Sequence, residues 1–226
     1  MEKGEYIQIS EDRLIEIGIN KNKLEQEQLK LSSKIRLEDI DIDSVKTIGG
    51  CYITYAGNKV IATIVIMDSK FDIIEEKFFA EKAVFPYIST FLSYRELPTL
   101  MKCWGKIEES PDAIMINRSG IMHPRKFGLA SHFGLAIDKP VIGITKEVLG
   151  GELKEGKVYL NNEVVAEEVI TKTGSNPIYI SPGNLISMKS AVELSKKWLK
   201  LPHKMPEPLD RAKRYADKVK EEFLNA

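Results

Sequence analysis

The sequence predicts an α/β fold in which one mixed sheet is flanked by helices. Two features of the 226-residue chain carry this prediction. Its first part holds runs rich in Ile, Val, Thr, Phe and Tyr that turn residues separate, a pattern typical of antiparallel strands. After residue 90, helical spacing of apolar residues alternates with short apolar runs, which is typical of parallel strands covered by helices.

The first part of the chain predicts a helix and then three strands that form an antiparallel meander. The segments between the strands carry Gly, Asn, Asp and Ser, the residues that tight turns favour. The preceding charged stretch has leucines at intervals that suit a helix. The expected helix is at residues 21–35, and the expected strands are at residues 45–55, 59–67 and 71–80.

The second part predicts alternating strands and helices with short connections, an order that implies parallel pairing. Pro98 lies inside the first of these helices, so that helix is either kinked there or begins later. A three-strand antiparallel meander followed by such units describes a ribonuclease H-like mixed sheet. The expected helices are at residues 90–109, 126–137, 187–200 and 209–224, and the expected strands are at 113–116, 141–144, 157–160, 163–170 and 178–180.

Composition favours a single domain over residues 1–226, because no Gly/Ser-rich linker or repeat divides the chain. Lys+Arg and Asp+Glu number 33 each, so any surface for nucleic acid must be a local patch. No apolar run approaches the roughly 20 residues of a membrane span, so no membrane is expected. Cys51 and Cys103 lie far apart without metal-ligand spacing. This cysteine usage suits a reducing compartment, and we expect a cytoplasmic protein.

An apolar, aromatic segment at residues 85–89 lies just before the first of the later helices. An apolar wedge led by an aromatic ring can insert between bases and unstack them. The alternative is a loop that packs its aromatic ring into the core. On the helix that follows, Glu96 is a candidate metal ligand, and the alternative for a lone glutamate is a solvated charge.

Polar residues follow two of the expected buried strands, at the carboxyl ends where ligand sites of α/β sheets are found. Residues 116–125, which include Asn, Arg, Ser and His, lie at the carboxyl end of one of them. His123 in this loop has the alternative of a structural, hydrogen-bonding role. Lys146 follows the next buried strand and can reach a phosphate, whereas the alternative is a lysine that extends to solvent.

Taken together and in order, these segments resemble endonuclease V, a family that cuts DNA or RNA near deaminated adenine (hypoxanthine). The resemblance covers about residues 24–217. It is most specific at residues 120–151, GIMHPRKFGLASHFGLAIDKPVIGITKEVLGG, which follow the family's Gly-His-Pro-Arg run. Residues 85–98, FPYISTFLSYRELP, are similar to the family's wedge and to the helix after it.

The resemblance implies metal-assisted phosphodiester hydrolysis, in which carboxylates converge on a magnesium ion. In this chain Tyr52 and Asn117 stand where the family has two metal-binding aspartates, and Asn184 stands where it has a histidine. Glu96 and Lys146 are retained. Because a phenol with a pKa of about 10 and a neutral amide are poor magnesium ligands, no metal is expected. Glu96 is then the one candidate ligand, and Mg²⁺ is the cofactor only if activity remains.

In the base pocket that the resemblance implies, Leu92, His123 and Gly128 fit the family, and Arg118 departs from it. Family members have glycine where this chain has Arg118, so an arginine there either fills the base pocket or puts its guanidinium where the metal would sit. The implied positions are Pro86, Tyr87, Ile88 and Ser89 for the wedge and Leu92, Arg118, Gly120, His123 and Gly128 for the base pocket.

The resemblance therefore implies a protein that binds inosine-containing, mismatched or branched DNA or RNA, with magnesium-dependent hydrolysis lost or strongly impaired. One alternative is an active deoxyinosine-type endonuclease of DNA repair with an altered metal site. A second alternative is a protein-interaction role without nucleic acid. The sequence does not choose between DNA and RNA and does not predict the oligomeric state.

Overall fold

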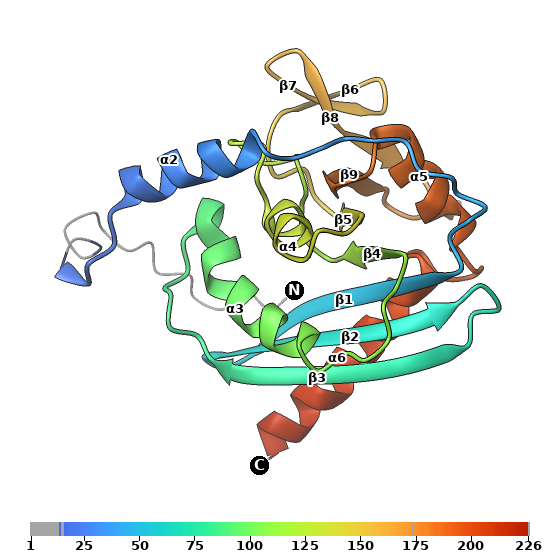
Figure 1. The fold of residues 1–226 in the computed structure, drawn as a ribbon, viewed down its shortest axis with the longest axis horizontal. Coiled ribbons are helices and arrows are strands. Elements are labelled where there is room, and N and C mark those ends of the chain that lie inside the picture. Colours follow the sequence, from blue (N-terminus) through green and yellow to red (C-terminus); the bar gives the residue numbers. More distant parts are fainter. Residues whose placement is uncertain (1–13, 15, 173, 226) are drawn as a thin grey trace.

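A computed structural model describes residues 14, 16–172 and 174–225. One mixed sheet of nine strands runs through the molecule, with helices on both of its faces (Figure 1). The strand order is β3-β2-β1-β4-β5-β9-β8-β7-β6. The predicted α/β class, a ribonuclease H-like mixed sheet flanked by helices, is confirmed.

Strands β1 (Thr47–Ala56), β2 (Lys59–Asp68) and β3 (Ile73–Lys82) form the predicted antiparallel meander. Almost all of β2 is buried, because helices cover this part of the sheet on both sides. Phe71 has a φ of +68° and belongs to the turn before β3. The prediction therefore began β3 too early, since a left-handed residue cannot continue an extended strand.

Two short buried strands extend the sheet in parallel. β4 (Ala113–Ile116) pairs with β1, and β5 (Val141–Thr145) pairs with β4. Helix α3 (Leu92–Trp104) covers the meander, and helix α4 (Leu129–Ile137) lies beside it over β5. A single 3₁₀ turn, η1 (Ser89–Phe91), leads into α3.

Helix α3 runs through Pro98, so it neither ends at this residue nor begins after it. Pro98 is exposed. The backbone carbonyl one turn earlier, which lacks a donor because proline has no N–H, can therefore bond water. The helix ends at Trp104 instead of residue 109 as predicted, and Gly105 caps it, because the Gly105 N–H closes the last turn on the Met101 carbonyl at 2.9 Å.

The remaining strands are all antiparallel: β6 (Glu152–Lys154), β7 (Lys157–Leu160), β8 (Glu163–Val169) and β9 (Ile178–Asn184). Strand β6 was not predicted, because its residues are exposed and carry no apolar pattern. Strand β9 was predicted to end at residue 180, whereas it continues through Pro182 to Asn184. The pairing of β9 with β5 is irregular next to this proline, where a ladder donor is missing.

Three further helices have their bounds within the described residues: α2 (Lys21–Ser32), α5 (Met188–Lys197) and α6 (Glu207–Asn225). α6 crosses the face of the sheet opposite α3, and its first turn lies directly on β1. A Cβ atom at Gly50 of β1 would lie 1.9 Å from the Pro208 carbonyl oxygen. Glycine at this position therefore permits the close approach of α6.

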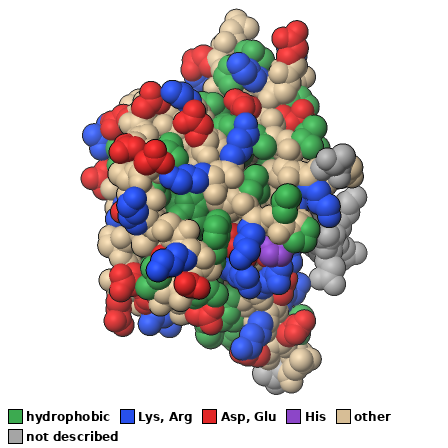
Figure 2. Space-filling model, turned by 90° about the vertical axis from the view of Figure 1, so that its right-hand side faces the viewer, with side chains coloured by type: hydrophobic (Ala, Val, Ile, Leu, Met, Phe, Trp, Pro, Cys, Tyr) green, Lys and Arg blue, Asp and Glu red, His purple; other side chains and the backbone are tan. Residues whose placement is uncertain are grey.

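Each face of the sheet has its own apolar core. One core lies between the sheet and helices α5 and α6, and the other lies between the sheet and helices α3 and α4. None of the described helices combines the length and the apolar character that crossing a membrane requires. Figure 2 shows acidic and basic side chains interspersed over one face, with Lys and Arg side chains gathered around a histidine below its centre.

Candidate functional site

The candidate site lies where β4 ends against the middle of β1, beside helix α3. β1 and β4 are in register at Cys51 and Ile116, so Tyr52 and Asn117 follow side by side. The Asn117 side chain continues the hydrogen bonding between β4 and β1 beyond the end of β4. Its Oδ1 accepts the Ile53 N–H at 2.8 Å, and its Nδ2 donates to the Ile53 carbonyl at 3.0 Å. The amide oxygen that would have to replace a carboxylate ligand is therefore already bonded to backbone.

Glu96 lies in the interior of this site, with none of its surface exposed. The alternative of a solvated charge is wrong, because three donors surround the carboxylate. Arg118 donates from Nε to Oε2 and from Nη2 to Oε1, both at 2.7 Å. The Tyr55 hydroxyl donates to Oε1 at 2.6 Å. Burial and then the nearby Glu96 charge raise the pKa of Tyr55, so the phenol keeps its proton.

Arg118 is held as firmly as its partner. Its Nη1 donates to the Asn117 carbonyl at 2.9 Å, and its Nη2 lies 3.4 Å from the Ile53 carbonyl. Burial acts to lower the pKa of Arg118, but the Glu96 carboxylate outweighs it and the pKa is raised. The guanidinium is thus a fixed cation at the carboxylate on which a metal would depend.

These residues do not fit a magnesium ion. Such an ion binds one or two carboxylates with additional oxygen ligands in octahedral geometry. Both oxygens of Glu96 accept hydrogen bonds from Arg118, one of them also from Tyr55, and the amide oxygen of Asn117 is bonded to Ile53. The ring of Tyr52 packs against the core on the α5 and α6 face of the sheet, away from the core that α3 covers, and its phenol is a poor magnesium ligand. An ion at Glu96 would also face the Arg118 charge.

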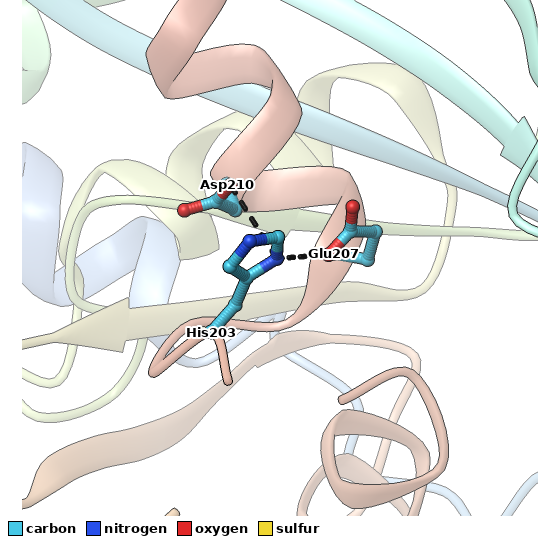
Figure 3. A group of neighbouring side chains, drawn as sticks. All are labelled: His203, Glu207 and Asp210. Atoms are coloured by element: carbon cyan, nitrogen blue, oxygen red, sulfur yellow. Dashed lines mark hydrogen bonds and ion pairs between the residues drawn. The ribbon is translucent and has the colours of Figure 1, made fainter. Parts of the chain in front are cut away.

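Within the described part of the chain, one group of three side chains has metal-ligand spacing: His203, Glu207 and Asp210 near the start of α6 (Figure 3). His203 Nδ1 lies 2.6 Å from Glu207, whose other oxygen accepts from Arg211 at 2.8 Å. Arg214 donates to Asp210 at 2.7 Å and lies 2.9 Å from His203 Nε2. Because these contacts occupy the ligand atoms, the group ties the loop before α6 to that helix and does not suit a metal.

A cavity of about 100 Å³ opens beside Arg118 and the wedge. The wedge residues Tyr87 and Ser89 form one side of it, so the structure brings the predicted wedge and the predicted base pocket together. The Ser93 hydroxyl, on the α3 wall, is buried, and no described residue hydrogen-bonds to it. The lining residues are Tyr87, Ser89, Thr90, Leu92, Ser93, Arg118, Ser119, His123, Pro124, Phe127, Gly128, Leu129 and Leu149.

The cavity is also lined by Ser93, Phe127 and Leu149, which were not predicted as pocket residues. Ser93 offered one signal, a small polar residue within an apolar stretch of α3. Gly120, a predicted pocket residue, does not line the cavity. A Cβ atom there would lie 1.9 Å from the Pro182 carbonyl oxygen, so Gly120 lets the loop rest on β9. At Gly128 a Cβ atom would similarly lie 2.3 Å from the Ser119 carbonyl oxygen.

His123 lines the cavity, but both of its ring nitrogens are occupied by backbone. Nε2 lies 3.0 Å from the Thr90 carbonyl, and Nδ1 accepts the Arg125 N–H at 3.2 Å. Burial, and then the nearby Arg125 charge, lower the pKa of His123 to about 4. The ring is therefore neutral near pH 7 and carries its proton on Nε2, in a structural role.

The wedge itself stays at the surface. Pro86, Tyr87 and Ile88 are half-buried and Ser89 is exposed. Phe91, just after the wedge, is the aromatic ring that packs fully into the interior. Within the segment itself, Phe85 packs against Tyr94 with their ring centres 5.8 Å apart, whereas Tyr87 lines the cavity, so the role of Tyr87 as a wedge stays a prediction.

The remaining predicted positions lie apart from Glu96. Lys146 is exposed just beyond β5. Burial, and then the nearby charge of Lys146, lowers the pKa of Lys204. Asn184 is buried opposite Val141, at the other end of β5. It accepts the Arg36 N–H at 3.1 Å and donates to the Gly134 carbonyl at 3.2 Å, so it joins three segments of the fold.

Known proteins resemble the chain over nearly all of its length. The family model for endonuclease V matches residues 29–214. Endonuclease V of Thermosipho melanesiensis is 32% identical over 204 residues, which are 87% of this chain and 89% of that protein. Endonuclease V of Archaeoglobus fulgidus is 33% identical over 214 residues, 92% of this chain and 96% of that protein.

Solved structures of the same family share the fold. Endonuclease V of Bacillus subtilis superposes with a TM-score of 0.81 at 23% identity, covering 98% of this chain and 97% of that one. Ciona intestinalis endonuclease V, in complex with DNA containing an inosine followed by a ribo-adenosine, gives a TM-score of 0.79 at 21% identity, covering 89% and 98% of the two chains. Sequence and fold agree, and the chain belongs to the endonuclease V family.

Proposed function

We propose that this chain binds inosine-containing, mismatched or branched DNA or RNA on an endonuclease V scaffold, and that its magnesium-dependent hydrolysis is lost or strongly impaired. One observation carries the proposal: Arg118 takes both oxygens of Glu96, the one carboxylate retained from the family's metal site. We also propose that the protein binds nucleic acid in the cytoplasm, the compartment that its cysteine usage favours.

Loss of the metal site is compatible with continued binding of phosphates. A unit charge pair about 4 Å apart is worth roughly 4 kcal/mol at an effective dielectric near 20, so free carboxylates without a metal would repel a phosphate. Here the aspartate positions are Tyr52 and Asn117, and Arg118 neutralises Glu96. A nucleic-acid backbone can therefore pass the site without a bridging ion.

The wedge and the cavity support recognition of a displaced base. A base pushed out by the wedge would enter a cavity that already adjoins Tyr87. Ser93 supplies a buried hydroxyl without a partner among the described residues, and four of the five N–H donors of Arg118 are engaged, which leaves one on Nη1. These donors suit the acceptor edge of an oxopurine. The Ciona relative in complex with inosine-containing DNA supports the same ligand.

The test is binding in the absence of divalent metal. We would measure fluorescence anisotropy in EDTA with three labelled duplexes: one containing a single inosine, one containing a mismatch, and a fully matched control. Preference for the inosine or mismatched duplex is expected without metal. The same three duplexes would be made as DNA and as RNA. If none of them binds at about 50 mM salt, where non-specific binding is strong, the nucleic-acid proposal fails and the protein-interaction alternative replaces it.

The active-enzyme alternative requires Glu96 to exchange Arg118 for a metal ion. Calorimetric titration with Mn²⁺ separates the two possibilities, with Glu96→Gln as the matched control. We expect no heat of binding that depends on Glu96. Binding of one ion that disappears in Glu96→Gln would favour the altered metal site and the active endonuclease.

A further inference from the structure

Three side chains converge on the backbone carbonyl of Thr90, the residue directly after the wedge. Gln28 Nε2 lies 3.2 Å from this oxygen, Arg125 Nη2 lies 3.0 Å from it, and His123 Nε2 lies 3.0 Å from it. The adjoining turn is closed by the Phe91 N–H on the Ile88 carbonyl at 2.9 Å. The position of the Thr90 carbonyl therefore fixes the turn that carries the wedge.

Gln28 and Arg125 also hold each other. Arg125 donates from Nε to Gln28 Oε1 at 2.5 Å, and its guanidinium lies 4.5 Å from the centre of the Phe91 ring. The side-chain amide of Gln28 thus accepts from Arg125 and donates to Thr90, which uses both of its ends. Gln28 and Phe91 are fully buried.

Helix α2 contributes Gln28 as its one buried residue, although the helix also carries three leucines. A helix that buries an amide and leaves Leu29 exposed gains little from the hydrophobic effect. A buried amide is instead retained where its hydrogen bonds define a geometry, because leaving them unmade is costly. The contribution of α2 is therefore the hydrogen bond by which Gln28 positions the Thr90 carbonyl.

We propose that Gln28 is a positioning residue for the wedge: through Arg125 and the Thr90 carbonyl, it holds Pro86–Ser89 at the mouth of the cavity. Helix α2 thereby takes part in discrimination between distorted and intact nucleic acid, without touching the base. This inference rests on the proposed function and names the part of the molecule that sets its selectivity.

The test is a double-mutant cycle on the full chain. Affinities of Gln28→Ala, Tyr87→Ala and the double variant would be measured for a mismatched duplex and for a matched duplex. Gln26→Ala is the matched control, because Gln26 is an exposed glutamine on the same helix. Gln28→Glu, which keeps the acceptor for Arg125 and loses the donor to Thr90, serves if Gln28→Ala does not fold.

We expect Gln28→Ala to weaken binding of the mismatched duplex about 5- to 10-fold, and of the matched duplex less than about 2-fold. The double variant should be no weaker than Tyr87→Ala alone. A lower melting temperature with unchanged selectivity, or full additivity with Tyr87→Ala, would overturn the inference. If Tyr87→Ala itself shows no substrate-dependent loss, the proposed wedge function fails first, so the two failures are distinguishable.

Discussion

Arg118 and Glu96 form an ion pair in the interior of the site, and removing either partner should lower the free energy of unfolding. Removing one partner of a buried ion pair costs about 3–5 kcal/mol, because the other charge remains buried without compensation. We therefore expect Arg118→Gly to lower the free energy of unfolding by about this amount, as measured by urea denaturation. The double variant Arg118→Gly with Glu96→Gln should recover most of the loss. Equal stability of Arg118→Gly and wild type would mean that the pair does not form.

His123 makes stability depend on pH. Its folded pKa of about 4 lies below the ordinary value of 6.5, so between these values the unfolded chain binds a proton that the folded chain does not. Stability from this residue is thus full above pH 6.5 and is lost as pH falls toward 4. From pH 7 to pH 5 the loss is up to about 2 kcal/mol.

His123→Gln provides the control for this prediction, since glutamine keeps a donor near the Thr90 carbonyl and does not titrate in this range. Urea denaturation at the two pH values should show a smaller difference for His123→Gln than for wild type. An equal difference would assign the pH dependence to other groups, His132 among them, whose pKa burial also lowers to about 4.

The wedge, residues 86–89, is the segment that should determine selectivity between distorted and intact duplexes. Base–aromatic stacking is worth roughly 1–3 kcal/mol per base, so Tyr87→Ala should weaken binding about 5- to 150-fold. The loss should be larger on a mismatched or bulged duplex than on an intact one, where unstacking costs more. Anisotropy titrations on both duplexes measure this. A lower melting temperature with equal loss on both would show that Tyr87 only supports the fold.

Periodicity predicted the strands of the meander, β4 and β5, because these elements are long or wholly apolar. It did not predict β6, whose exposed residues are extended only by pairing with β7. It also did not decide whether the helix passes through Pro98, because local propensity does not tell whether the proline faces water. Prediction from sequence succeeded where burial imposes an apolar pattern on an element, and it failed where strand pairing or contact with solvent decides the conformation.

The sequence predicted several residues of the candidate site, but it did not predict the contacts that those residues make with one another. Resemblance indicated that Arg118 would occupy either the pocket or the metal position, and the structure shows that it lines the cavity while it binds Glu96. Nothing local in the sequence indicates that Tyr55 completes this group or that Gln28 reaches Thr90. These contacts join residues that lie far apart in the chain: α3 brings Glu96 to Tyr55 of β1, and α2 brings Gln28 to Thr90.

Across the whole molecule, zero net charge leaves attraction to nucleic acid to local groups such as Lys146. A single phosphate contact contributes about one unit to the slope of log affinity against log salt. Lys146→Ala should therefore weaken binding to all duplexes alike and reduce that slope by about 1, in contrast to Tyr87→Ala. Titrations at several salt concentrations test this, and a loss confined to one duplex would exclude a phosphate contact.

The most direct test of the central claim is nicking of an inosine-containing duplex by the wild-type protein in Mg²⁺ or Mn²⁺. Losing Lewis-acid and nucleophile activation together should leave nicking undetectable, or at least about 10³-fold below that of a family member with both aspartates, assayed in parallel. Robust nicking that disappears in Glu96→Ala would contradict the account, since it would require Glu96 to leave Arg118 and bind a catalytic metal.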